Sequence, residues 1–164
     1  MLKPKIICLT PIKNEDWILD RFLSAASLWA DSIIIADQNS DDSSREIVKQ
    51  HKKVIYIKNN SDKYDELSRQ KLLLKEARKI KGPKIFMALD ADEFLSNYNT
   101  ESPEWKTILS SPPGTVIRFK WVHLSPDLKR GVYSTFRFPW GYVDDGLEHT
   151  GRSIHSPRIP VPEF

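Results

Sequence analysis

The sequence predicts an α/β fold, in which a mostly parallel, Rossmann-like sheet is flanked by helices. Short apolar runs alternate with helical patterns over the first 90 residues, which implies parallel strands joined by right-handed crossovers. The runs are apolar throughout rather than alternating, as expected for a sheet covered on both faces. Polar clusters follow three of the four runs. Since ligands bind at the carboxyl ends of the strands in such sheets, we expect these clusters to form one site.

The four expected strands are short runs rich in β-branched and other apolar residues, ended by proline or by polar residues. They are residues 5–10, 32–36, 54–57 and 84–89. "KIICLT", the first of them, runs directly into Pro11, and the last runs into Asp90.

Three helices are expected between these strands, at residues 17–29, 43–51 and 64–81. The first has its apolar residues on one face at helical spacing. In the second, Ser43 and Glu46 match the pattern of a capping box. Gly82 and Pro83 give the third helix a strong stop signal.

The second half of the chain has a different texture. Ser102 and Pro103 predict the cap and first position of a short helix. Two strand-like runs follow, at residues 115–124 and 131–138, and the tail from Trp140 shows little periodicity.

Composition narrows the class of protein. The 164 residues suit one domain, 40% of them are hydrophobic, and the net charge of +3 is mild, so no nucleic-acid partner is expected. No apolar segment is long enough to span a bilayer. Cys8 is the single cysteine, which excludes an intrachain disulfide and indicates a buried thiol. We expect a cytoplasmic protein.

Three carboxylates, Asp90, Asp92 and Glu93, crowd the end of the fourth strand. They repel one another at neutral pH, so a positive partner is expected. Mg²⁺ or Mn²⁺ suits this position, because these ions prefer oxygen ligands and take one or two carboxylates together with phosphates and water. The alternative is a set of exposed carboxylates that cap a loop.

Three motifs carry a family resemblance. "PIKNE", "IIIADQNSDD" and "IFMALDADEF", in this order and spacing, resemble the nucleotide-sugar-binding half of the inverting glycosyltransferase family two, which has the GT-A fold. The resemblance covers residues 5 to about 96 well and the remainder loosely. It implies a nucleotide-sugar-binding half at residues 1–96 and an acceptor-side half of the same domain at 97–164. Because the chain is shorter than most members of that family, we expect the acceptor side to be incomplete.

The resemblance also implies roles for individual residues. Pro11 and Glu15 would line the nucleotide pocket. Asp37 would contact the base or the ribose. Asp90 would face the ribose, and Asp92 would bind the metal that bridges the diphosphate.

Two positions near these motifs bear on the donor. Gln38 stands where many members have a second aspartate that reads the base, and an amide can donate as well as accept. Arg69 and Gln70 resemble an Arg-Asn pair near the start of the third helix, where an anion would be bound.

The tail offers the remaining candidates. His155, in "IHS", resembles a late "VHE" element and is a candidate metal or phosphate ligand. Inverting transfer needs a general base to take the acceptor proton, and Asp145 is favoured over Asp144 and Glu148. Trp140 could stack on an acceptor sugar.

The function expected from the resemblance is metal-assisted transfer, with inversion, of a sugar from a nucleoside diphosphate to a hydroxyl of a saccharide or lipid-linked acceptor. Cell-surface polysaccharide synthesis and peripheral association with the inner face of the membrane would fit such an acceptor. Two alternatives stay open. One is a phosphohydrolase of the haloacid-dehalogenase type that uses Asp90 and Asp92, and the other is a non-catalytic nucleotide-sugar-binding domain.

Overall fold

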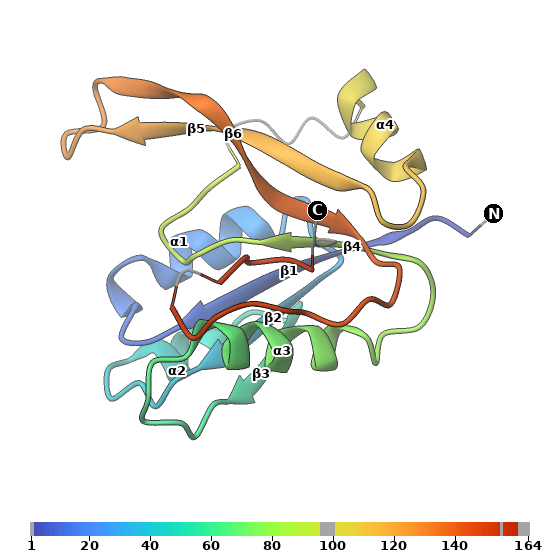
Figure 1. Ribbon diagram of the computed structural model, residues 1–164. Helices are drawn as coiled ribbons and strands as arrows, with labels where there is room; N and C mark the ends of the chain where they lie inside the picture. The colour runs from blue at the N-terminus through green and yellow to red at the C-terminus, as the bar shows by residue number, and fades with distance from the viewer. Residues whose placement is uncertain (1, 96–100, 155, 161–164) are drawn as a thin grey trace.

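The sheet has six strands in the order β3-β2-β1-β4-β6-β5 (Figure 1). The computed structural model describes residues 2–95, 101–154 and 156–160. The strands are β1 (Lys5–Ile12), β2 (Ser32–Asp37), β3 (Val54–Lys58), β4 (Lys84–Ala88), β5 (Val116–Leu124) and β6 (Gly131–Val143). The helices are α1 (Asp16–Ala26), α2 (Ser44–Val48), α3 (Glu66–Ala77) and α4 (Pro103–Ser110).

The first four strands in this order are all parallel. Ile12 at the end of β1 lies opposite Asp37 at the end of β2, and Leu9 lies opposite Ala88 of β4. The carboxyl ends of β1, β2 and β4 therefore meet at one edge of the sheet, which we call the carboxyl edge. The predicted α/β fold with a mostly parallel sheet is confirmed.

The second half of the chain extends the same sheet. β6 runs antiparallel to β4 and pairs with it over residues 141–143, and β5 pairs with β6. Gly141 permits this close packing, because a Cβ atom there would lie 2.9 Å from Ile117 Cβ and from Met87 Sδ.

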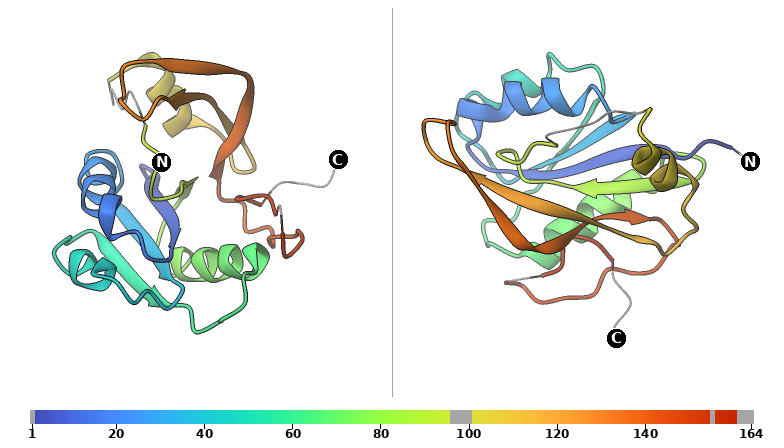
Figure 2. Two further views of the ribbon diagram at one scale, coloured as in Figure 1. Left: turned by 90° about the vertical axis from the view of Figure 1, so that its left-hand side faces the viewer. Right: turned by 90° about the horizontal axis from the view of Figure 1, so that it is seen from above.

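Helices cover both faces of the parallel strands (Figure 2). On one face α1 buries Leu19, Phe22 and Leu23 against the sheet, and α2 packs beside it. On the other face α3 buries Leu73 and Leu74. This two-sided cover explains why the central strands lack the alternation of a half-exposed sheet.

Helix boundaries differ from the prediction: α1 ends at Ala26 rather than 29, α3 ends at Ala77 rather than 81, and α2 and the start of α3 also differ. α2 is short, and the predicted capping box does not form: Ser43 makes no side-chain cap, while Asp42 accepts from the Ser44 backbone N–H at 2.9 Å. α3 begins after Asp65, which accepts from the Ser68 N–H at 3.1 Å. A carboxylate with extended backbone is a better cap than the preceding tyrosine, so the helix starts later than its periodicity predicts.

The tail runs along α3 and returns to the carboxyl edge. Arg78 at the end of α3 pairs with Asp144 at 3.0 Å, and the Glu66 N–H at its start donates to the Ser153 carbonyl at 2.9 Å. His149 and Ile159 are fully buried although no periodicity marks them. Within the described ranges, no helix has the length and hydropathy needed to cross a membrane.

Candidate functional site

The loops that follow β1 and β2 are hydrogen-bonded to each other at the carboxyl edge. The Asn14 N–H donates to Ser40 Oγ at 2.9 Å, and its side-chain amide donates to Asp41 at 2.7 Å. The Glu15 N–H donates to Ser44 Oγ at 3.1 Å. The loop after β1 is thus fixed to the loop after β2.

The carboxylates of these loops lie close to those that follow β4. Burial raises the pKa of Glu15, and the negative charges of Asp92 and Asp90 raise it further, against a hydrogen bond from the Trp17 indole that lowers it. Asp42 adds to the repulsion. The parallel register of β1, β2 and β4 thus brings the three polar clusters to one edge, and the charges that act on Glu15 agree with it.

A tail residue, Arg158, supplies positive charge to this edge. Its guanidinium donates to Asp90 Oδ2 at 2.6 Å and also to Glu93. It lies 4.4 Å from the centre of the Trp140 ring, within the range of a cation–π contact. Burial still raises the pKa of both Asp90 and Glu93, while Arg158 opposes the rise.

Arg158 neutralises only part of the acidic cluster. Asp92 is exposed, and neither it nor Glu15 forms an ion pair with any residue that the structure describes. Carboxylate oxygens are the ligands that hard divalent cations prefer, so Asp92 and Glu15, which have no cationic partner among the described residues, suit Mg²⁺ or Mn²⁺. No group of three or more His, Cys, Asp or Glu residues could hold a metal within the described part of the chain. Phosphate and water oxygens would have to complete the coordination.

Asp37 and Gln38 lie at the carboxyl edge, but their side chains are already engaged in hydrogen bonds with other residues of the chain. Asp37 is fully buried and accepts from Ser40 N–H at 2.9 Å, from Ser40 Oγ at 2.6 Å and from the Tyr56 hydroxyl at 2.6 Å. The Gln38 amide donates to the carbonyls of Ser61 and Lys63 at 3.2 and 2.9 Å. Both side chains hold neighbouring segments in place.

Pro11 and Arg69, two of the predicted ligand-binding residues, lie on β1 and α3. Pro11 is buried in β1 and pairs in register with Ala36. The Arg69 guanidinium lies 4.6 Å from the centre of the Tyr64 ring, and its positive charge, like that of Arg158, opposes the rise that burial causes in the pKa of Asp90. Its Nε atom is buried with no hydrogen-bond partner in the described chain, so it retains a free donor.

Asp145 is not brought to this cluster. β6 is antiparallel to β4 with Val143 opposite Ile85, and the Asp144 N–H donates to the Lys84 carbonyl, so Asp145 lies past the amino end of β4. That is the edge opposite Asp90. His155 lies outside the described residues.

Sequence reasoning named the carboxylates but missed their protein partner and the residue that fixes the loops. Arg158 is 68 residues from Asp90, so no local pattern links them. Asn14 has a positive φ of 57°, a conformation that asparagine adopts more readily than most residues. The asparagine in "PIKNE" was the available signal for that loop.

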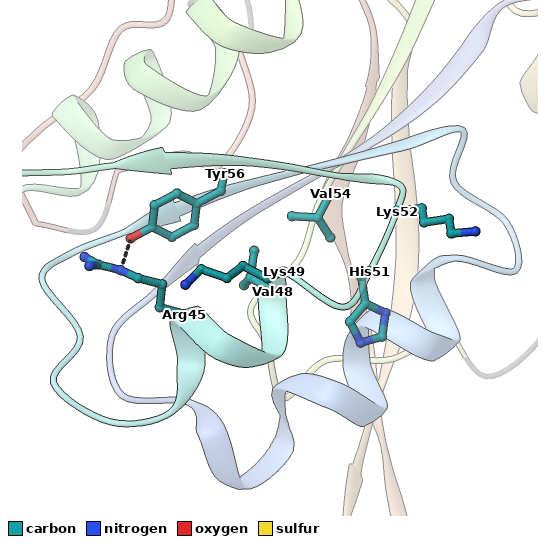
Figure 3. A pocket seen from close by; sticks show the side chains of 7 residues that line it. All are labelled: Arg45, Val48, Lys49, His51, Lys52, Val54 and Tyr56. Carbon is teal, nitrogen blue, oxygen red and sulfur yellow. Dashed lines mark hydrogen bonds between the residues drawn. The ribbon is translucent and has the colours of Figure 1, made fainter.

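A separate hollow of about 370 Å³ lies beside α2 and β3 (Figure 3). It is lined by Arg45, Val48, Lys49, His51, Lys52, Val54 and Tyr56. Arg45 donates to the Tyr56 hydroxyl at 3.3 Å, and Tyr56 in turn donates to Asp37. The hollow is therefore linked to Asp37 through Tyr56, but none of the described carboxylates of the carboxyl edge lines it.

Comparisons with known proteins bear on the fold alone. No protein-family profile matches the sequence, and no curated protein matches it. A similar solved structure is a crystal structure of 4-diphosphocytidyl-2C-methyl-D-erythritol synthase, with 12% identity and a TM-score of 0.52. The match covers 88% of this chain and 74% of that chain. It agrees with the Rossmann-like α/β architecture, and membership of glycosyltransferase family two stays a hypothesis.

Proposed function

We propose that this chain is a nucleotide-dependent transferase that moves a sugar from a nucleoside diphosphate to an acceptor hydroxyl, with inversion. The observation that carries the proposal is the group of carboxylates at the carboxyl edge, two of which lack a cationic partner within the described residues. Ligands bind at this edge in doubly wound sheets. The resemblance of the three motifs to glycosyltransferase family two supports the choice of sugar transfer.

Asp92 and Glu15 would hold Mg²⁺ or Mn²⁺. When bound there, the ion would neutralise charge on the diphosphate leaving group. Arg69 would approach the phosphates with the donor that has no partner in the described chain. Asp90 would orient the ribose, since Arg158 uses its Oδ2 atom and leaves the other carboxylate oxygen for a hydroxyl.

The nucleoside would lie over the ends of β1 and β2. Pro11 and Gln38 would form the floor of the nucleoside site. The Gln38 amide already donates to the carbonyls of Ser61 and Lys63, so it would act on the nucleoside only through the loop that it holds at residues 61–63. Asp37 would act by fixing this floor, because its carboxylate is already bonded to Ser40 and Tyr56.

The acceptor would enter beside Trp140, whose ring lies next to Arg158 and therefore next to Asp90. Aromatic rings commonly provide flat apolar surfaces for the faces of sugars. A saccharide or a lipid-linked saccharide would both present such a face. No base role is assigned to Asp145, which lies at the other edge.

A screen of UDP-, GDP-, dTDP- and CMP-sugars, with and without Mn²⁺, would test the proposal by thermal shift. A ligand at a hundredfold its dissociation constant stabilises by about 2.7 kcal/mol, which is readily measured. Asp92→Asn should remove the Mn²⁺-dependent part of the shift, and Asp127→Asn, a remote exposed carboxylate, should not. If Asp92→Asn binds donor and Mn²⁺ as the wild type does, Asp92 is not the ligand.

Nucleotidyl transfer is the second candidate, and the fold likeness favours it, because the similar structure is a synthase named for a diphosphocytidyl product. Product analysis separates the candidates. Sugar transfer releases a nucleoside diphosphate from a nucleotide-sugar donor. In nucleotidyl transfer a phosphorylated acceptor takes the nucleotidyl group from a nucleoside triphosphate, which releases pyrophosphate. A phosphohydrolase would cleave simple phosphate monoesters, and a non-catalytic domain would bind donor without turnover.

A further inference from the structure

The outer part of the β5–β6 hairpin extends beyond the four parallel strands (Figures 1 and 2). We call residues 118–137 the arm. β6 pairs with β4 only over residues 141–143, whereas its residues from 131 to 139 pair with β5 alone. A two-stranded hairpin without further cover is marginally stable in water, so a surface that covers the arm would stabilise it.

The arm exposes large apolar side chains. Leu128 and Val132 are each 71% exposed, Tyr133 is 72% exposed and Phe136 is 75% exposed. Leu124, next to the turn, is 59% exposed. Single exposed apolar residues are ordinary, but five on one short hairpin indicate an interaction surface.

The arm is also strongly basic. Its lysines and arginines are all exposed: Arg118, Lys120, Lys129, Arg130 and Arg137. Asp127 is its only acidic residue, so the arm carries five minus one, or +4, while the whole chain carries +3. None of the five cations forms an ion pair with a described residue. Asp127 accepts from the Ser125 hydroxyl and the Lys129 N–H, and so fixes the turn.

We propose that the arm binds the surface of an anionic phospholipid bilayer. Exposed Leu, Val, Tyr and Phe side chains fit the boundary between headgroups and acyl chains, and lysines and arginines fit lipid phosphates. A second copy of the chain is the less favourable occupant, since it would bring +4 against +4. The arm lies in the interface rather than across the bilayer, because its strand edges could not be satisfied in hydrocarbon.

The arm is continuous with the candidate site. The Trp121 ring lies 5.7 Å from that of Phe138 and 5.4 Å from that of Trp140, centre to centre, and Arg158 stacks on Trp140. An arm bound to a bilayer would therefore hold this row of rings near the membrane surface. The inference does not depend on the proposed function, because lipid binding is measured without any substrate.

Co-sedimentation of the full chain with vesicles tests the proposal, using phosphatidylcholine alone and phosphatidylcholine with about 30% phosphatidylserine. We expect binding to the anionic vesicles that weakens with salt. A cation near such a surface contributes roughly fivefold to partitioning, so Lys129→Glu/Arg130→Glu should lower it by more than about twentyfold. Phe136→Ser should also lower it. Lys52→Glu/Lys75→Glu makes the same change of charge on exposed residues away from the arm and should have a much smaller effect.

Three outcomes would overturn the proposal. The first is no binding of the wild type to anionic vesicles. The second is an equal loss in the arm variant and the control variant, which would mean that only net charge matters. The third is lipid-free dimerisation, measured by sedimentation velocity, that Phe136→Ser abolishes, which would assign the arm to a second copy. Phe136→Ser keeps the test decisive if the double charge variant fails to fold.

Discussion

Replacing Arg158 with alanine would remove the guanidinium that bridges Asp90 and Glu93. Loss of one partner from a buried ion pair costs about 3–5 kcal/mol. Here the Glu93 side chain is 12% exposed but that of Asp90 is 43% exposed, so water can solvate one of the two carboxylates. We therefore expect a loss of about 2–3 kcal/mol at neutral pH. For a domain of this size that corresponds to a fall in melting temperature of about 4–12 °C.

The effect should depend on pH in a defined direction. The pKa values of Asp90 and Glu93 are raised above their ordinary values of 3.8 and 4.5, chiefly by burial, and Arg158 opposes the rise. A raised pKa means that these groups favour the folded state when protonated and cease to do so as pH rises through the folded pKa. Without Arg158 the rise is larger. The difference in stability between variant and wild type should therefore shrink as pH falls from 7 toward 4.5.

Thermal unfolding followed by circular dichroism between pH 4.5 and 8 measures this difference. Arg158→Lys is the control, because it keeps one positive charge but loses the fork that reaches both carboxylates. A double variant with Glu93→Gln should recover part of the loss, since Glu93 is then neutral. An Arg158→Ala protein that melts with the wild type at every pH would refute the view that Arg158 neutralises the pair.

Three further predictions concern the core and the edge. Asp37→Ala should destabilise the fold by about 2–4 kcal/mol in urea unfolding, because it leaves the Tyr56 hydroxyl and Ser40 without their acceptor. Tyr56→Phe should cost about 1 kcal/mol. An Asp37→Ala protein with the stability of the wild type would contradict this network. Burial raises the pKa of the Cys8 thiol to about 12, so alkylation by iodoacetamide at pH 8 should be slow in the native protein and fast in urea, and equal rates would contradict its burial. Gly141→Ala should cost about 1–3 kcal/mol by calorimetry, since its Cβ would press on Ile117 and Met87 at 2.9 Å, and a neutral substitution would mean that these neighbours yield freely.

The sequence was informative where structure is local or periodic. The apolar runs that became β1, β2, β3 and β4 predict a parallel sheet because burial on both faces removes alternation. The cap at Ser102 is confirmed, with its hydroxyl accepting from the Trp105 N–H at 3.1 Å. Such features depend on residues within a few positions of one another.

Features that depend on distant partners could not be predicted in this way. The tail around Arg158 has no periodicity, yet Ile159 is fully buried against the α3 face of the sheet. Asp145 was chosen by its place after an aromatic segment, but the direction of β6 decides which edge it reaches, and a strand's direction follows from its partner rather than from its own residues. Asp37 was assigned to the ligand by the family resemblance, whereas its hydrogen bonds to Ser40 and Tyr56 appear only once β3 is placed beside β2.

Crowding of carboxylates after β4 now has a two-part physical explanation. Arg158 brings one positive charge to Asp90 and Glu93 and needs no ligand to do so. Asp92 and Glu15 remain; burial raises the pKa of Glu15, and the negative charge of Asp92 raises it further. A divalent ion bound by this second pair would not have to displace Arg158, because the two pairs use different carboxylates. A diphosphate would then meet positive charge from both the ion and Arg69, so the proposed donor complex would form without disrupting the contacts of Arg158 with Asp90 and Glu93.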